Sequence, residues 1–417
     1  MAAADPAPGS TSVYRQAGFS AFLLARLMAV LATQVQAVVV AWQVYDLTRT
    51  PIALAYVGLA QFLPMLLLLL PAGDLIDRYS RKPILAISWA VGCACSAALW
   101  WLAGHGAAGV NGIYAVLLVF GCSRAFSGPA LQSLLPQIVP RQHLAQAIAA
   151  NGMLIRSASI GGPFLGGLLY AAGGGALTYA VCLACFALGT ALLVLRVPVA
   201  RTPVTSSASG TIWQRFGAGI HFIRSRPIIL GTISLDLFAV LLGGVVALLP
   251  VYAREILHVG PQGLGALRSA MAVGEVTAGL YLSARPFDRH VGARMFIAVA
   301  VFGLANLVFS LSSVFWLSLA ALAVAGAADM VSVYIRGALV QFSTPDEMRG
   351  RVNAVNMLFI GSSNELGEFR AGSAAASLGL VPAAVTGALC TLGVVGTWAL
   401  LFKPLRRVDR FEEASGG

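Results

Sequence analysis

Long runs of apolar residues, separated by short polar segments, make up most of this chain. A helix needs about 20 consecutive, mainly apolar residues to cross a bilayer. The pattern therefore predicts twelve membrane-crossing helices. We place them at residues 20–45, 51–72, 83–104, 112–134, 147–171, 177–196, 227–250, 262–283, 295–312, 315–340, 352–378 and 381–402.

The longest polar stretch separates the sixth run from the seventh. Residues 198–210 are rich in Pro, Ser and Thr and indicate a flexible linker. From Thr211 to Arg224, the apolar residues Trp213, Phe216, Ile220 and Ile223 recur at helical spacing. This spacing predicts an amphipathic helix lying on the cytoplasmic surface, with its arginines toward headgroups or water. We expect five parts: a disordered N-terminus (1–19), a first bundle (20–196), this linker region (197–226), a second bundle (227–402) and a tail (403–417).

The two halves repeat each other weakly. A shift of 205 residues places Pro140 and Asn151 on Pro345 and Asn356, so the fifth crossing helix corresponds to the eleventh. Parallel repeats of this kind are typical of secondary transporters. The expected fold class is an all-α membrane protein of twelve transmembrane helices in two pseudo-symmetric six-helix bundles.

Composition and charge support this interpretation. Of the 417 residues, 58% are hydrophobic and 10% charged, against a usual charged share of about 25%. The net charge is +11, yet nearly all Lys and Arg between the runs fall on one set of segments, which includes both termini. The opposite set carries only Arg49 and Arg254. Because basic residues mark the cytoplasmic side, we expect both termini in the cytoplasm and no nucleic-acid partner.

The cysteines give no sign of a disulfide framework or a metal site. All six lie inside predicted crossing helices: Cys93, Cys95, Cys122, Cys182, Cys185 and Cys390. Cys182 and Cys185 are one helical turn apart, but no His or acidic residue accompanies them. We interpret them as packing residues.

A polar hairpin between the second and third runs reads Gly73-Asp-Leu-Ile-Asp-Arg-Tyr-Ser-Arg-Lys82. A solvated turn that fixes topology would explain its basic residues, but not Gly73 or the carboxylates Asp74 and Asp77. The pattern G-x-L-x-D-R-x-[GS]-R-[KR] resembles the loop that characterises the major facilitator superfamily. The resemblance implies a transporter whose central cavity opens alternately to the two sides. It also implies a conformational latch, formed by Gly73, Asp77, Arg78, Arg81 and Lys82.

Two further motifs resemble those of proton-coupled exporters. Arg124 in Arg-Ala-Phe-Ser-Gly128 resembles the R-x-x-x-G motif of the fourth helix, whose arginine is associated with proton coupling. A buried ion pair that only ties helices together is the alternative. The fifth helix holds a partial antiporter motif, similar to that of drug/proton exporters, which favours export. Its residues are Gly162, Pro163, Gly166 and Gly167.

Acidic residues inside crossing helices are concentrated in the second half. They are Asp236, Glu275, Asp329, Glu365 and Glu368. Each could be a structural ion-pair partner, and Arg336 and Arg370 could hold some of them permanently. Glu365 and Glu368 are three residues apart, hence on one helix face, where mutual repulsion favours protonation of one of them. We expect Asp329, Glu365 or Glu368 to carry a proton with Arg124 nearby, and Asp236 and Glu275 to be the next candidates.

Polar residues in other helices are candidates for the substrate cavity: Arg26, Gln34, Arg156 and Arg336. Arg26 could instead extend to the membrane surface, as long basic side chains near helix ends do. Arg336 lies two turns from Asp329 on the same helix face and could pair with that acid or with an anionic substrate.

Residues Thr344 to Arg351, with Ser363-Asn-Glu-Leu-Gly-Glu368, resemble the enterobactin-exporter branch of the superfamily. The resemblance implies proton-driven export of a siderophore across a bacterial inner membrane, by a monomer without cofactor or catalytic residues. A broad-specificity drug exporter is the alternative. An ATP-driven pump would need a separate motor, because the chain has no G-x-x-x-x-G-K-[ST] loop. An uncoupled channel or receptor has no evident use for so many buried acids.

Overall fold

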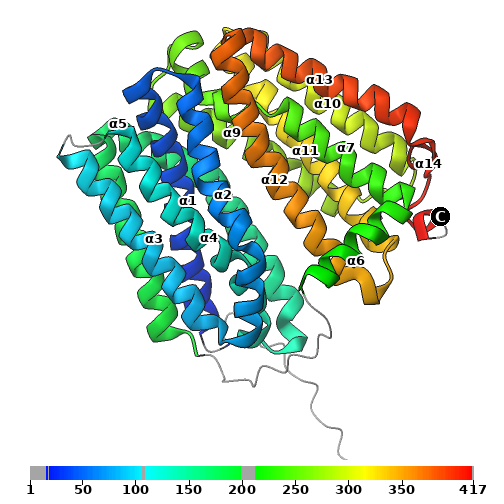
Figure 1. Ribbon diagram of the computed structural model, residues 1–417, viewed down its shortest axis with the longest axis horizontal. Helices are drawn as coiled ribbons and strands as arrows, with labels where there is room; N and C mark the ends of the chain where they lie inside the picture. Colours follow the sequence, from blue (N-terminus) through cyan, green and yellow to red (C-terminus); the bar gives the residue numbers. More distant parts are fainter. Residues whose placement is uncertain (1–15, 17, 106–108, 199–211, 416–417) are drawn as a thin grey trace, which may run out of the picture.

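The computed structural model describes residues 16, 18–105, 109–198 and 212–415. The predicted disordered N-terminus and the Pro/Ser/Thr-rich linker lie almost entirely outside these residues. The described part is helical nearly throughout, and its helices form two groups that lie side by side (Figure 1).

The first group contains five helices. They are α1 (Phe19–Thr48), α2 (Pro51–Arg78), α3 (Arg81–Gly104), α4 (Val110–Ile138) and α5 (Leu144–Arg196). Helix α5 joins the predicted fifth and sixth crossing segments, and the chain reverses direction at Gly173 and Gly174. Gly174 has a φ of +64°, a backbone conformation that glycine adopts without steric cost.

The second group follows α6 (Ile212–Ser225). Its seventh crossing segment is composite: α7 (Pro227–Gly243), a 3-10 turn η3 (Val246–Leu248), α8 (Leu249–Val251) and a π-helical turn η4 (Tyr252–Ile256). Then come α9 (Pro261–Ala284), α10 (Val291–Leu311), α11 (Phe315–Phe342), α12 (Asp346–Leu378) and α13 (Leu380–Leu401). A short α14 (Lys403–Arg407) packs back on the bundle through the buried side chain of Leu405.

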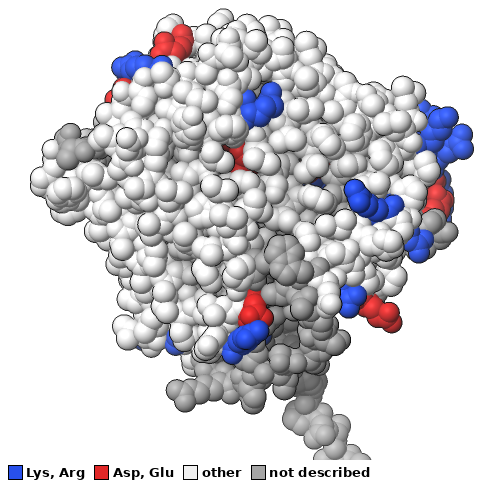
Figure 2. All heavy atoms as spheres, viewed as in Figure 1, with Lys and Arg blue, Asp and Glu red and all other residues white. Residues whose placement is uncertain are grey.

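Among the described residues, nine helical segments are long and apolar enough to cross a membrane. Helix α5 crosses twice, and α9 and α12 are less apolar than the nine because they carry charged residues such as Arg268 and Glu365. Counting α5 as two segments and adding α9 and α12 gives twelve crossings, which confirms the predicted fold class. Figure 2 shows a face that is mostly uncharged, with a small number of charged side chains spread over it.

Helix α6 lies where the sequence predicts an amphipathic helix, and it packs its apolar residues on the second group of helices. Phe216, Ile220 and Ile223 pack against Val340 of α11 and Val352 of α12, among other apolar residues of the second group. These described apolar side chains are therefore covered by protein. The helix belongs structurally to the second group.

The bundle has two distinct ends. The hairpin end carries the α2–α3 turn at Tyr79–Ser80, the end of α5 and the start of α12; the far end carries the α1–α2 turn at Arg49–Thr50 and the start of α9. The two groups meet along two seams, α5 with α9 and α2 with α12. Helices of the fifth and eighth crossings form one seam, and helices of the eleventh and second form its pseudo-symmetric equivalent.

Candidate transport site

The α5–α9 seam is tightly closed toward the far end. A β-carbon at Gly265 would lie 2.5 Å from the carbonyl oxygen of Pro163, so only glycine permits this approach of the two backbones. One turn closer to the hairpin end, the Ser269 hydroxyl donates a hydrogen bond to the carbonyl of Ile160 at 2.7 Å. The antiporter-motif residues thus form part of the contact between the two halves.

The α2–α12 seam closes in the same direction. The rings of Tyr56 and Phe369 lie with centroids 6.4 Å apart, and Gly372 packs against the backbone of Pro51. At the outermost point of the far end, α1 is joined to the π-helical turn η4. Here Asp46 forms an ion pair with Arg254.

A cavity of about 700 Å³ lies between the halves at the hairpin end. It is lined by α2 and α4 on one side and by α6 and the first half of α12 on the other, including Gly73 and Glu347. Exposed lining residues such as Arg351 and Met357 show that the cavity communicates with the surroundings. The structure is therefore closed at the far end and open at the hairpin end.

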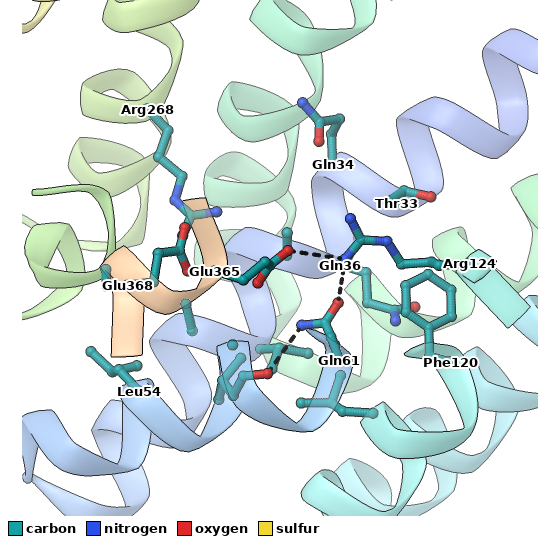
Figure 3. Close-up of a pocket in the computed structure, with 17 residues that line it drawn as sticks. Thr33, Gln34, Gln36, Leu54, Gln61, Phe120, Arg124, Arg268, Glu365 and Glu368 are labelled. Carbon is teal, nitrogen blue, oxygen red and sulfur yellow. Dashed lines mark hydrogen bonds and ion pairs between the residues drawn. The ribbon is translucent and has the colours of Figure 1, made fainter. Parts of the chain in front are cut away.

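A smaller central pocket of about 190 Å³ lies deeper, where the seams begin. Its polar lining comes from five helices: Thr33, Gln34 and Gln36 of α1, Gln61 of α2, Arg124 of α4, Arg268 of α9, and Glu365 and Glu368 of α12 (Figure 3). Arg124 lines both the pocket and the larger cavity. It is therefore positioned where the two meet.

Arg124 connects the two halves. Its guanidinium lies 3.6 Å from the Glu365 carboxylate and donates a hydrogen bond to the Gln61 side-chain oxygen at 3.3 Å. The Gln61 amide nitrogen in turn donates to the Val57 carbonyl at 3.4 Å, which orients the amide oxygen toward Arg124. The predicted partnership of Arg124 with an acid of the second half is present in the structure.

The second acid of α12, Glu368, lies in the same pocket one turn from Glu365. The Arg268 guanidinium of α9 lies beside its carboxylate (Figure 3) and interacts with it electrostatically. Neither Glu365 nor Glu368 contacts Arg336 or Arg370 through an ion pair among the described residues.

A second charged cluster lies at the α5–α9 seam. Arg156 of α5 pairs with Glu275 of α9 at 2.5 Å, and Asp329 of α11 interacts electrostatically with both. This cluster is the pseudo-symmetric counterpart of the first with the charges exchanged. In the first cluster the arginine comes from α4, the fourth crossing, and the acid Glu365 from α12, the eleventh. In the second cluster the acid Asp329 comes from α11, the tenth crossing, and the arginine Arg156 from the first part of α5, the fifth.

Arg336 and Asp236 lie elsewhere than expected. They form an ion pair with each other between α11 and α7, and their side chains are only 6% and 8% exposed. Neither lines the central pocket or the larger cavity. Arg336 was expected to pair with Asp329 of its own helix or with a substrate. It pairs instead with Asp236, which is distant in sequence but adjacent in the folded bundle.

The antiporter-motif glycines lie at helix contacts, and Arg26 lies away from both cavities. Gly162 and Gly166 pack against α1 at Gln34 and Val35, and Gly167 packs against Gln262 at the start of α9. Arg26 lines neither cavity, and its Nε is buried without a hydrogen-bond partner among the described residues.

In the hairpin, Lys82 donates hydrogen bonds to the carbonyls of Val194 and Val197 at the end of α5. Arg78 pairs with Asp74 of its own helix at 2.9 Å, and the Nε of Arg81 is buried without a described partner. The side chain of Asp77 lies outside the described residues. The hairpin is thus held to its own half in this open state.

Sequence analysis did not single out Gln61 or Arg268 as site residues. Both could have been found by the signal that identified Arg124 and Gln34, a polar side chain inside an apolar run. Their significance depends on which helix face they occupy, and that face is set by packing against neighbouring helices.

Two bundles related by a pseudo-two-fold axis, with a polar pocket between them that opens at one end, define a transporter of the major facilitator type. The chain belongs to the transmembrane secretion effector family of this superfamily, whose pattern it matches over residues 9–416.

Curated relatives are similar over most of the chain. The enterobactin exporter EntS of Citrobacter koseri is 28% identical over 352 residues, covering 81% of this chain and 80% of that protein. The enterobactin exporter EntS of Salmonella paratyphi A is 26% identical over 414 residues, covering 95% and 94%. The match to the enterobactin-exporter branch is thereby confirmed.

Solved structures share the fold. A bacterial homologue of the iron transporter ferroportin in an inward-facing state has a TM-score of 0.70 at 16% identity, over 95% of this chain and all of that one. A bacterial homologue of the lysosomal transporter Spinster, inward-facing and occupied, has a TM-score of 0.69 at 14% identity, over 95% and 96%. The protein is a multi-pass membrane transporter, and its family implies a small-molecule substrate.

Proposed function

We propose that the protein is a secondary active exporter that exchanges protons for a siderophore by alternating access. The observation that carries the proposal is the pair Arg124–Glu365. It joins the two halves at the inner limit of the open cavity, 3.6 Å apart, with a second carboxylate one turn away. A proton taken up by Glu365 would weaken this link, and its release would restore the link. Proton binding would therefore be coupled to the relative position of the halves.

The proposed orientation follows the distribution of basic residues. The hairpin end, and with it both termini, would face the cytoplasm of a bacterial inner membrane. The structure would then represent the inward-facing state, ready to take a substrate from the cytoplasm. The transporter would act as a monomer, without a nucleic-acid partner.

The substrate class rests on the similarity to enterobactin exporters. The cavity agrees in size, because a volume of about 700 Å³ lies within the range of about 300–1,000 Å³ that is usual for sites of drug-sized ligands. The same cavity favours the second candidate, a broad-specificity drug exporter. Residues such as Phe62, Met65 and Leu66 give one wall an apolar surface without directed polar groups.

Comparison of secreted metabolites with and without this protein, under iron limitation, tests the substrate class. The proposal predicts that one metal-chelating compound disappears from the medium and accumulates in the cells. An unchanged set of secreted compounds, together with lower tolerance to several unrelated drugs, would favour the broad-specificity exporter instead.

A further inference from the structure

After the last crossing helix the chain folds back on the second group of helices. Helix α14 packs against α7, α10 and α13 (Figure 1), and the 3-10 turn η5 (Phe411–Ser415) packs against α11. Three apolar side chains of this segment are at most 8% exposed: Leu405, Val408 and Phe411. We call residues 403–415 the C-terminal strap. Its buried side chains make it part of the folded second group.

The C-terminal strap is bound to the first turn of α10 through the backbone. The amides of Val291 and Gly292 donate hydrogen bonds to the carbonyls of Asp409 and Val408, at 3.2 and 3.0 Å. The amide of His290 donates to the Asp409 carboxylate at 2.9 Å. The first amides of a helix have no acceptor within the helix itself. The strap therefore supplies acceptors that the start of α10 needs.

Aromatic rings connect the C-terminal strap to the α9–α10 turn and to the end of α11. The centroid of the Phe411 ring lies 6.1 Å from that of Tyr334 and also 6.1 Å from that of Phe342, the last residue of α11. Tyr334 in turn contacts Phe287 of the α9–α10 turn, with centroids 5.7 Å apart. Ring pairs about 4.5–7 Å apart attract each other. Phe411 thus holds the end of α11.

The end of α11 determines where α12 begins. Three residues, 343–345, separate Phe342 from Asp346, the first residue of α12. The first turn of α12 lines the open cavity with Glu347, and the hairpin end of α2 lines the same cavity with Gly73. Because the connection is so short, a displacement of the end of α11 also displaces this wall of the cavity.

The first half has a corresponding connection of different chemistry. Lys82, at the start of α3, donates hydrogen bonds to the carbonyls of Val194 and Val197, where the chain leaves the sixth crossing. In the second half, amides at the start of α10 bind the segment that follows the twelfth crossing. The second connection continues into Phe411, which extends it to the tenth crossing.

We propose that the C-terminal strap is a positioning element for closure of the hairpin end. By holding the end of α11, it keeps the first turn of α12 where the hairpin can close on it. A loosened strap lets this turn move and so disfavours the state that is closed at the hairpin end. The proposal rests on the proposed function only in taking the halves to alternate between two states. It involves neither the substrate nor the proton gradient.

Hydrogen exchange of the full-length protein in lipid nanodiscs, without substrate or gradient, tests the proposal. Phe411→Ala should speed exchange of residues 340–352 at least about fivefold, because the ring that holds the end of α11 is lost. Exchange of residues 42–50 and 252–260, which reports opening of the far end, should slow about two- to fivefold. The reason is that the far end opens when the hairpin end closes, and the variant disfavours that state. General destabilisation would instead speed exchange in all these regions.

Tyr281→Ala is the matched control, because it removes a ring of α9 in the same half that is 60% exposed. It should change exchange in none of these regions. Phe411→Leu keeps part of the apolar contact and should act in the same directions as Phe411→Ala, by less. Asp409→Ala removes the side-chain acceptor of the His290 amide and should speed exchange of residues 290–294, with smaller effects of the same sign elsewhere.

Unchanged exchange of residues 340–352 in Phe411→Ala would overturn the proposal. Faster exchange there, accompanied by equal or faster exchange at the far end in both Phe411 variants, would overturn it as well. A protein that shows both expected changes but no gradient-driven export would instead contradict the proposed function alone.

Discussion

Individual charged residues in this protein differ in how exposed they are and in which parts of the fold they join. Arg124 and Glu365 join the two halves beside a cavity, with side chains 35% and 17% exposed. Asp236 and Arg336 lie within one half and are nearly inaccessible. The first pair is partly accessible from the cavity, whereas the second is almost fully enclosed by protein.

For the first pair we predict a loss of coupling without a loss of binding. Glu365→Gln should reduce gradient-driven efflux by at least about tenfold, while substrate binding and passive exchange persist, because the amide cannot carry a proton. Efflux and counterflow assays on the same vesicles measure the two properties. If Glu365 is only structural, the variant should lose thermal stability instead, and removal of Arg124 as well should restore it.

For the second pair we predict a loss of stability. Asp236→Asn leaves the Arg336 guanidinium buried without its counter-charge, which typically costs about 3–5 kcal/mol. The thermal unfolding temperature should fall clearly, and the double variant Asp236→Leu, Arg336→Leu should recover most of it. Wild-type stability in Asp236→Asn would show that the pair is not structural.

At the scale of elements, the far end is closed by a contact between α1 and the π-helical turn η4. Asp46 pairs with Arg254 of η4 and, at 3.4 Å, with Arg49 of its own helix end. Tyr45 donates a hydrogen bond to Glu255 at 3.2 Å. Arg49 and Arg254 are the two basic residues that the topology prediction assigned to the outer side. In the structure both contact the same acid, Asp46.

Asp46 has two basic partners in this state. We predict that when the far end opens it loses the contact with Arg254 and keeps the contact with Arg49. Asp46→Asn and Arg254→Gln should each raise the far-end-open population about two- to fivefold, as expected for a partly exposed ion pair. Hydrogen exchange of residues 42–50 and 252–260 measures this change. Arg49→Gln is the matched control and should not raise the open population. An equal rise of the open population in all three variants would contradict the selective loss of the Arg254 contact.

The hairpin between α2 and α3 is the element at the opposite end. We propose that Asp77 accepts hydrogen bonds from the first turn of α12 when the hairpin end closes, because free N–H groups and the helix dipole favour an anion there. Asp77→Asn should slow transport severalfold and keep the hairpin end open, measured by hydrogen exchange at residues 346–352. Asp74→Asn, which removes an exposed acid paired only with Arg78 among described residues, is the control. Normal transport by Asp77→Asn would rule out the latch.

The elements themselves could be predicted from the sequence because apolar runs of membrane length leave few alternatives. The polar residues inside those runs also pointed to the site, and Arg124, Gln34, Glu365 and Glu368 do share one pocket. Their partners were harder to predict, because sequence reasoning relates neighbours on one helix. Asp329 was expected near Arg336, but it interacts with Arg156 across the seam. Partner choice depends on how α5, α9 and α11 are rotated against one another.

At the scale of the whole molecule, the two seams share one organisation. Each has close backbone contacts at glycines toward the far end, joined in the α2–α12 seam by the rings of Tyr56 and Phe369, and each ends in a charged cluster where the open cavity begins. Closure of the hairpin end would require the halves to rock about these clusters. The exchanged charges of the two clusters place an arginine of the first half opposite an acid of the second in both seams.

The central claim is that the proton gradient drives export, and everted membrane vesicles test it directly. Uptake of radiolabelled enterobactin into such vesicles corresponds to export, and respiration supplies the gradient. We predict that an uncoupler stops uptake while ATP is held constant, and that Glu365→Gln vesicles show the same low uptake without the uncoupler. Uptake by wild-type vesicles that continues at its full rate after the gradient has collapsed would contradict the account.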